Sequence, residues 1–330
     1  MKRANLARNV TVSLIVGGLC AYLAFRRVAA ADVLAALARF DDLYLAAAVA
    51  ISLAIQVIRA WRWQLELRPL ARLPFGLLWK VVAVSYMMIN VLPARLGEPV
   101  RPLLLSWKTG LPVSSIVANW VFEKTMDTAA LVLFIHLALI TNDLPPWAYR
   151  AAEGSLGLLA VLALAVVGFW ARGTQLAEAT IGPLLPARAR STFARVLSSA
   201  RLGLEILPDR RLVLTVFAAT VALWSLPVLS SYVVILGFGF DLPPPAALVV
   251  FVAIGVGTAL PHPPGMFGVF QIAAVVALGL FGVPKADALA YGLVLNAIQF
   301  VTLVAQGLVA LPFLDVSLER LTRGALASPR

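Results

Sequence analysis

The sequence predicts an all-α polytopic membrane protein, with about six spanning helices and two oppositely oriented re-entrant hairpins made of broken helices. Hydrophobic residues make up 61% of the 330 residues and charged residues only 13%, whereas a soluble domain carries about 25% charged residues. Apolar segments of roughly membrane-spanning length recur along the chain. We therefore expect a single integral membrane domain over residues 1–330 and no soluble catalytic domain of ordinary size.

The first apolar segment resembles a signal peptide, because the basic stretch 1–8 leads into the apolar run 10–25. However, Arg26 and Arg27 follow directly, and no small-residue cleavage site ends the run. We therefore expect an uncleaved first span. The six predicted spans are residues 9–26, 43–59, 113–140, 152–171, 212–236 and 288–313.

Two further apolar regions, about 75–107 and about 246–282, are interrupted near their middles by an L-P-x-x-x-G pattern. The two copies, at 92–97 and 260–265, are offset by 168 residues. Two broken elements of opposite orientation are typical of inverted-repeat transporters. Irregular backbone at membrane depth must be buried in protein or line a wet cavity, so we expect both tips near a central site. Alternatively, both are kinks that only shape the bundle.

The basic residues predict the orientation in the membrane. With both termini cytoplasmic, 19 of the 27 Lys and Arg residues fall in cytoplasmic stretches, five in outer stretches and three in apolar regions. We expect the inner (plasma) membrane of a bacterium. Residues 32–40 are predicted as a short outer amphipathic helix, Trp61 and Trp63 as an interfacial anchor, and about 172–211 as a cytoplasmic amphipathic segment on anionic headgroups.

Several function classes are excluded by composition and motif. The formal charge of +11 lies in short loops, as insertion signals do, so no nucleic-acid partner is expected. Cys20 is the only cysteine, and two histidines with one cysteine form no recognisable zinc site. No P-loop, Rossmann glycine pattern or nucleophile elbow occurs. We therefore expect no metal, no cofactor and no enzymatic activity.

Charged residues follow the first break, although a charge at the centre of a spanning helix costs about 2.5–3.5 kcal/mol. Asn90 precedes the break, and Arg95, Glu98 and Arg101 follow it. Arginine's planar fork suits a phosphate group, so Arg95 and Arg101 are predicted to bind an anionic headgroup in a polar cavity. Alternatively, these charges form ion pairs that lock the first hairpin against the 113–140 span.

The 113–140 span carries a second charged group. Glu123 and Asp127 are four residues apart and share a helix face, with Lys124 beside them. The two acids are predicted to orient the arginines or to contact a cationic part of the substrate, and the ion-pair alternative applies here too. His262 lies between two prolines at the second break. It could contact substrate, or it could be a satisfied histidine at the tip.

Three motifs resemble those of flippase-like membrane proteins related to the transmembrane domain of lysylphosphatidylglycerol synthase (the UPF0104 group). Residues 90–101 are similar to that family's N-x-x-P-x-R-x-G-E-x-x-R motif, and 123–127 to its E-R-x-x-D helix, with Lys124 in place of arginine. Residues 264–271 resemble its P-G-G-x-G-x-x-E segment. Gln271 stands where the family has glutamate, and Asn296 where the last span often carries arginine. The loss of both charges suggests that a charged pair at this site is replaced by a neutral pair.

The resemblance implies lipid translocation or the handling of lipid-linked sugars. We predict a lipid flippase or scramblase that moves an anionic phospholipid or a polyprenyl-linked headgroup. One alternative is a non-transporting membrane partner of a glycosyltransferase or lipid-modifying enzyme. Another is an intramembrane lipid enzyme that uses Glu98, Glu123 or Asp127 as acid or base. No synthase activity is expected, because this chain has no aminoacyl-transfer domain. The predicted substrate-binding residues are Asn90, Pro93, Arg95, Gly97, Glu98, Arg101, Glu123, Lys124, Asp127, Pro261, His262, Gly265, Gln271 and Asn296.

Overall fold

The computed structural model describes residues 3–93, 97–257 and 263–316, and helices are the only regular elements in these ranges. Five helices are long and apolar enough to cross a membrane, or six if one bent pair counts as a single span. This confirms the predicted class. The five are α3 (Asp42–Leu67), α6 (Val113–Thr141), the run Ala148–Leu184 that contains most of α7 (Pro146–Gly168), α10 (Arg210–Gly237), and the run Lys285–Leu314 that joins α13 (Lys285–Ala310) to η5 (Leu311–Leu314).

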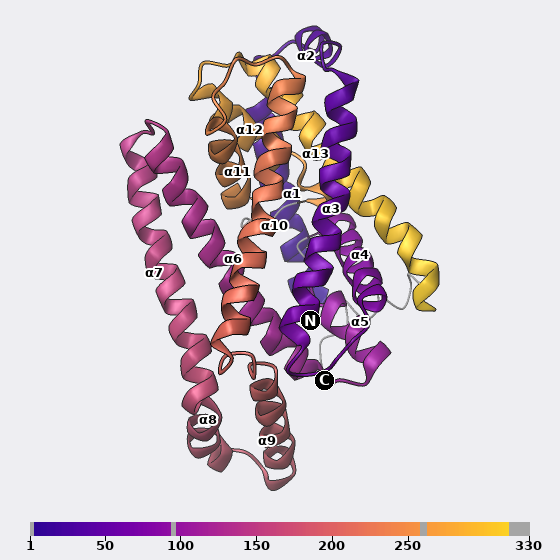
Figure 1. Cartoon of the computed structure of the whole chain (residues 1–330), viewed down its shortest axis with the longest axis vertical. Helices are drawn as coiled ribbons and strands as arrows, with labels where there is room; N and C mark the ends of the chain where they lie inside the picture. The colour runs from indigo at the N-terminus through magenta and orange to yellow at the C-terminus, as the bar shows by residue number, and fades with distance from the viewer. Residues whose placement is uncertain (1–2, 94–96, 258–262, 317–330) are drawn as a thin grey trace.

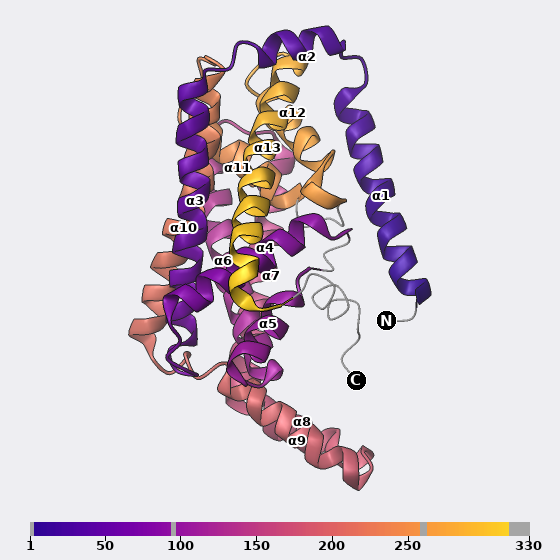
Figure 2. The ribbon, with the colours of Figure 1, turned by 90° about the vertical axis from the view of Figure 1, so that its right-hand side faces the viewer.

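The bent pair lies at the start of the chain. Helix α1 (Arg3–Phe25) runs along one side of the bundle, and α2 (Ala30–Leu37) crosses the end of the bundle (Figure 2). The apolar part of α1 and α2 meet at 84°. The short helix predicted at 32–40 is thus present, two residues earlier in sequence, and packs on α13.

Helix α3 corrects one prediction, because it continues to Leu67 instead of ending at residue 59. Arg62 and Trp63 are each only 1% exposed, so they are not part of an interfacial anchor, whereas Trp61 is 44% exposed. A prediction from hydropathy alone ends the span where the first arginines occur. Here Arg62 remains inside because carboxylates on another helix pair with it. Moving Arg59 and Arg62 into the span leaves 17 of the 19 predicted cytoplasmic basic residues in place.

Both interrupted regions are pairs of short helices. The first comprises α4 (Phe75–Val91) and α5 (Val100–Thr109), and the second α11 (Ala246–Gly257) and α12 (Val269–Gly279), with the 3-10 turn η4 (Pro264–Met266) before α12. The pairs lie toward opposite ends of the bundle, α4 and α5 in the lower half and α11 and α12 in the upper half (Figures 1 and 2). This placement agrees with two broken elements. Their re-entrant paths and inverted relationship stay predictions.

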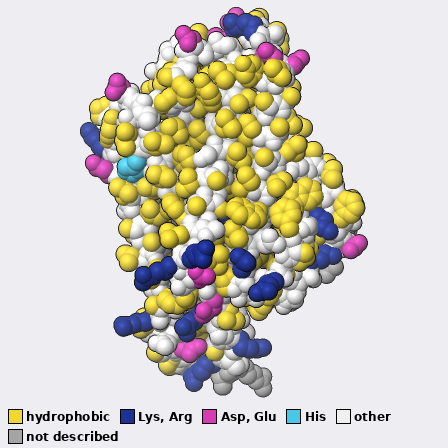
Figure 3. All heavy atoms as spheres, in the orientation of Figure 1, with side chains coloured by type: hydrophobic (Ala, Val, Ile, Leu, Met, Phe, Trp, Pro, Cys, Tyr) yellow, Lys and Arg dark blue, Asp and Glu magenta, His cyan; other side chains and the backbone are white. Residues whose placement is uncertain are grey.

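Two large apolar clusters fill the bundle. One joins α10, α11, α12 and α13 in the upper half, and the other joins the end of α3 to α4, α5 and the end of α13. Most of the visible outer surface is also apolar. Figure 3 shows hydrophobic side chains over the middle of the molecule and Lys and Arg gathered below them. A membrane protein is expected to have this distribution, since the outer face of the bundle contacts lipid.

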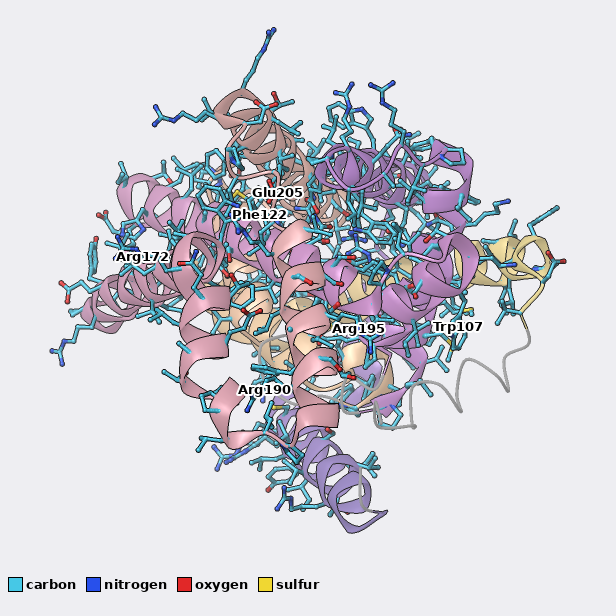
Figure 4. All side chains as sticks on the ribbon, turned by 90° about the horizontal axis from the view of Figure 1, so that it is seen from below. Trp107, Phe122, Arg172, Arg190, Arg195 and Glu205 are labelled. Atoms are coloured by element: carbon cyan, nitrogen blue, oxygen red, sulfur yellow. The ribbon has the colours of Figure 1, made fainter. Side chains whose placement is uncertain are left out.

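A helical hairpin extends below the bundle. Helix α7 passes through a π-helical turn, η2 (Phe169–Gly173), into α8 (Thr174–Thr180), and after η3 (Gly182–Leu184) the chain returns as α9 (Ala187–Leu202). Figure 4 shows Arg190 and Arg195 on α9 from below. A Cβ on Gly203 would lie 2.0 Å from the Ser115 carbonyl oxygen, so only glycine allows the end of α9 to pack on the start of α6. The predicted contact of this segment with headgroups stays a prediction.

Candidate functional site

Arg62 lies at the centre of a buried charged cluster. Its Nη1 donates to Asp127 Oδ1 at 2.5 Å, and its Nη2 donates to Glu123 Oε1 at 2.7 Å. Its Nε is 3.2 Å from Glu66 Oε1, one helical turn further along α3. Three carboxylates from α3 and α6 therefore surround one guanidinium. Because both of its terminal nitrogens donate to carboxylates of α6, Arg62 is a structural brace between the two helices.

Arg101 is the second buried arginine, and it is only partly engaged. Its Nη1 lies 2.7 Å from Glu123 Oε2, which ties α5 to α6, and its guanidinium stacks 3.9 Å from the centre of the Trp63 ring. This is the ion-pair lock that the sequence allowed. Nevertheless, Arg101 Nε and Nη2 are buried and have no hydrogen-bond partner among the described residues. Arg101 thus has two donors that the described residues leave unused.

Asp127 connects this cluster to a fourth helix. Besides Arg62, its carboxylate accepts from Trp224 Nε1 on α10 at 3.0 Å and from Lys124 Nζ at 3.2 Å. A carboxylate with three donors is well compensated for burial. Helices α3, α6 and α10 are therefore held together through one side chain.

A cavity of about 380 Å³ opens beside the cluster, bounded by helices from α3 to α13. One end is basic and aromatic. Arg59, Arg101 and Lys124 line it, and Arg59 stacks 3.9 Å from the centre of the Tyr86 ring. The other charged or polar side chains lining this end are Arg62, Asn90, Glu98 and Asp127. Cations with incompletely used donors are suited to binding an anion.

The other end of the cavity is largely apolar. Ile254 and Phe270 are among its walls, and Ser52 and Ser231 also line the cavity. Ser52 precedes Arg59 by seven residues on α3, which corresponds to about 10 Å along the helix axis. The cavity is thus amphiphilic, with a charged end in the lower half of the bundle and an apolar end toward α11 and α12.

The second break is closed by its own hydrogen bonds. Gly268 N donates to Gln271 Oε1 at 2.7 Å, which caps the start of α12. Gln271 Nε2 donates to Asn296 Oδ1 at 3.4 Å, and Asn296 Nδ2 donates to the Gly265 carbonyl at 2.9 Å. Gln271 and Asn296, which the resemblance sets at charged positions of the family, therefore contact each other. Gln271 is fully buried and supports the loop, although Asn296 also reaches the cavity.

The structure brings together six of the fourteen predicted site residues on the cavity wall. These are Asn90, Glu98, Arg101, Lys124, Asp127 and Asn296. Gly97, Glu123, Gly265 and Gln271 are buried and do not line it. A Cβ on Gly97 would lie 2.3 Å from Ile89 N, so its role is close backbone packing. Pro93 is half-buried between α4 and α5, and Arg95, Pro261 and His262 lie outside the described residues.

Sequence reasoning missed the contribution of α3. Arg59, Arg62 and Glu66 follow one another at intervals of three and four residues, so they share one helix face. That spacing was the available signal, whereas the two arginines were predicted to flank the interfacial anchor at Trp61 and Trp63. Within the ranges that the structure describes, no group of three or more His, Cys, Asp and Glu side chains could hold a metal ion.

Fold and site define a polytopic helical membrane protein with a charged cavity buried among its helices. The chain matches the family described as the lysylphosphatidylglycerol synthase TM region over residues 10–307. It therefore belongs to that family, which confirms the resemblance that the three motifs indicated. The match includes both broken helix pairs and every described residue of the cavity wall.

Two curated relatives are similar at low identity. The chain is 25% identical to "Glycosyltransferase AglD" of Haloferax volcanii over 353 aligned residues, which cover 96% of this chain and 56% of that protein. It is 24% identical to a "UPF0104 membrane protein" of Methanothermobacter thermautotrophicus over 306 residues, which cover 86% of this chain and 88% of that protein. The chain thus spans only about half the length of the glycosyltransferase.

Proposed function

We propose that this protein is a lipid flippase or scramblase that moves an anionic phospholipid or lipid-linked headgroup across the membrane. The observation that carries the proposal is the amphiphilic cavity, in which Arg59, Arg101 and Lys124 line one end and apolar side chains line the other. A charged headgroup crosses a bilayer only if protein replaces the water around it. The basic end of this cavity offers that replacement.

Arg101 is the residue best placed to contact a phosphate. Its Nε and Nη2 are free of hydrogen bonds to described residues, while Glu123 and Trp63 hold the guanidinium in place. Fixing the donors in advance reduces the entropy cost of binding. Arg59 and Lys124 add charge from two other helices. No bond is made or broken in this process, so an enzymatic reaction is not part of the proposal.

The size of the cavity supports transport of a headgroup with the tails outside. Ligand pockets are typically about 300–1,000 Å³, and 380 Å³ is near the lower limit. A headgroup fits this volume, whereas two acyl chains or a polyprenyl chain do not. The tails would therefore remain in the surrounding lipid while the headgroup passes between the helices.

The second candidate is a non-transporting membrane partner of a glycosyltransferase or lipid-modifying enzyme. One observation favours it: a relative that aligns over 96% of this chain is named "Glycosyltransferase AglD". The region shared with that protein could present a lipid to an enzymatic domain. This candidate predicts no lipid movement by the purified chain and co-purification with a membrane enzyme.

The test is fluorescent-lipid translocation in proteoliposomes, read out with a membrane-impermeant reductant that quenches only the outer leaflet. We expect anionic lipids to lose inner-leaflet protection when wild-type protein is present. Arg101→Gln removes the charge at the cavity and should lower the rate at least about 10-fold, in line with a lost charge-assisted hydrogen bond. Arg210→Gln, at the exposed start of α10, is the matched control.

Each outcome separates the candidates. Movement in wild type and Arg210→Gln but not in Arg101→Gln supports transport through this cavity. If well-folded wild-type protein moves no headgroup, the proposal is wrong and the partner hypothesis takes its place. If Arg101→Gln is as active as wild type, lipid takes another route and the cavity is not the path.

A further inference from the structure

Ser52 differs from most hydroxyl side chains of the spanning helices. Serine and threonine in helices usually donate to the carbonyl four residues earlier, as Ser225 does to Val221 O at 2.9 Å and Thr302 to Ile298 O at 2.6 Å. Ser52 is 5% exposed, and its Oγ has no hydrogen-bond partner among the described residues. Ser52 also lines the cavity, so a buried hydroxyl without a described partner lies at the cavity wall.

Other neutral polar groups line the same cavity. Ser231 of α10 and Gln299 of α13 also line it, and both helices pack against α3. Ser231 follows Trp224 by seven residues on α10, and Ser52 precedes Arg59 by seven on α3. On each helix the hydroxyl is therefore about 10 Å along the axis from the charged end. Ser52 and Ser231 thus form a second polar zone, separate from the basic one, and Gln299 of α13 adds an amide to the same cavity wall.

This second zone carries no charge. The charged side chains on the cavity wall are Arg59, Arg62, Glu98, Arg101, Lys124 and Asp127, and Ser52 and Ser231 each lie about 10 Å along their helices from this group. A cationic headgroup such as an aminoacyl lipid would place its ammonium there without a carboxylate, which is costly for a buried charge. Hydroxyl and amide groups instead suit a partner that both donates and accepts hydrogen bonds.

We infer that the cavity recognises a lipid phosphate that carries a neutral polyol or sugar. The phosphate binds at the basic end, and the hydroxyl groups bind at Ser52, Ser231 and Gln299. Trp120 and Trp224, which also line the cavity, offer flat amphipathic surfaces at the charged end, next to Lys124 and Asp127. The inference rests on the proposed function and narrows it to one class of headgroup.

The test is a binding measurement that does not require transport. Detergent-solubilised protein is titrated with dioctanoyl lipids that share one phosphate and the same short tails: phosphatidylinositol, phosphatidylglycerol, phosphatidic acid and phosphatidylethanolamine. Each hydrogen bond gained to a hydroxyl should tighten binding about 2- to 10-fold. We expect phosphatidylinositol or phosphatidylglycerol to bind at least about threefold more tightly than phosphatidic acid, and phosphatidylethanolamine to bind most weakly.

Variants locate the preference. Ser52→Ala and Gln299→Ala should each reduce the preference for the hydroxylated lipid while leaving the affinity for phosphatidic acid unchanged. Ser225→Ala is the matched control, because Ser225 is exposed on α10 and donates to its own helix. The unchanged phosphatidic acid affinity would show that the variants remain folded and that the basic end is intact.

The inference is overturned if neither hydroxylated lipid binds more tightly than phosphatidic acid, or if the preference survives in both variants. Absence of binding by all four lipids overturns it as well. These results are distinct from failure of the proposed function. A binding preference without lipid movement in proteoliposomes would sustain the headgroup inference for a lipid-presenting partner protein, and movement without preference would sustain transport alone.

Discussion

Arg62 Nη2 lies 2.7 Å from Glu123 Oε1 and joins α3 to α6 across 61 residues of sequence. The other Glu123 oxygen lies 2.7 Å from Arg101 Nη1 on α5. One carboxylate thus holds two arginines with different tasks. Arg62 is surrounded by three acids and braces the bundle, whereas Arg101 retains two free donors at the cavity. Structure and binding depend on the same carboxylate, but they can be separated through the arginines.

We expect Arg62→Ala to destabilise the fold severely. It would leave Glu66, Glu123 and Asp127 buried without their common cation, and breaking a buried pair typically costs about 3–5 kcal/mol. The measurement is the thermal unfolding temperature in detergent, together with the monodisperse fraction by size-exclusion chromatography. Arg101→Gln should lower the unfolding temperature much less, since Glu123 would still pair with Arg62. Equal stability of Arg62→Ala and wild type would show that Arg62 is not a brace.

Much of the fold was predictable because it depends on local properties of the sequence. Apolar runs of sufficient length gave the spans, and proline with glycine marked both breaks. The end of α3 was not predictable by that route, since Arg62 and Glu66 lower the hydropathy just where the helix continues. The energy that retains them comes from Glu123 and Asp127 on α6, a tertiary contact that hydropathy does not contain.

The kind of site was predictable from the sequence, but only some of the residues that form it were. Charges in apolar segments indicated a polar cavity, and Arg101, Lys124 and Asp127 are on its wall. Gln271 belongs to the same motif set, but its side chain caps α12. A motif identifies which residues act together, whereas the direction of each side chain follows from packing. That difference explains why a motif residue can be a support and a non-motif residue, Arg59, can line the cavity.

Gly268→Ala should disrupt the second break. Gly268 has φ +85°, and a Cβ there would lie 2.2 Å from the Gly17 carbonyl oxygen on α1. Alanine at this position would therefore introduce backbone strain, typically about 1–3 kcal/mol. Its Cβ would also overlap with the Gly17 carbonyl oxygen. Two controls separate these costs. Gly239 has φ +67° but nothing within 4 Å of the Cβ position, and Gly279 has an open position without positive φ.

The expected order of unfolding temperature is therefore Gly279→Ala highest, Gly239→Ala lower and Gly268→Ala lowest. Thermal unfolding in detergent measures all three in parallel. If Gly268→Ala and Gly239→Ala lower the unfolding temperature equally, only backbone strain matters. The close approach of α1 to the second break would then not contribute to stability.

Orientation can be tested with single cysteines across the Ala148–Leu184 helix. The positive-inside rule places α9 in the cytoplasm and the α6–α7 loop outside, and these lie at opposite ends of the molecule (Figure 1). In a Cys20→Ser background, a membrane-impermeant maleimide should label Asp143→Cys in intact spheroplasts and Arg195→Cys only after permeabilisation. The reverse pattern would invert the proposed orientation. Labelling of both from one side would show that this helix does not cross.

The Gln271 and Asn296 pair offers a test of whether the family's charges were replaced together. Nε2 of Gln271 lies 3.4 Å from Oδ1 of Asn296, so charges at these two positions would be in contact. Gln271→Glu alone buries an uncompensated charge and should cost about 3–5 kcal/mol. Asn296→Arg alone should cost less, because Asn296 is half-buried on the cavity wall. In the double variant the new carboxylate and guanidinium can pair, so the combined loss should be smaller than the sum. A double-mutant cycle of unfolding free energies should give a coupling of about 0.5–3 kcal/mol. Additive losses would mean that the two positions do not form one paired site.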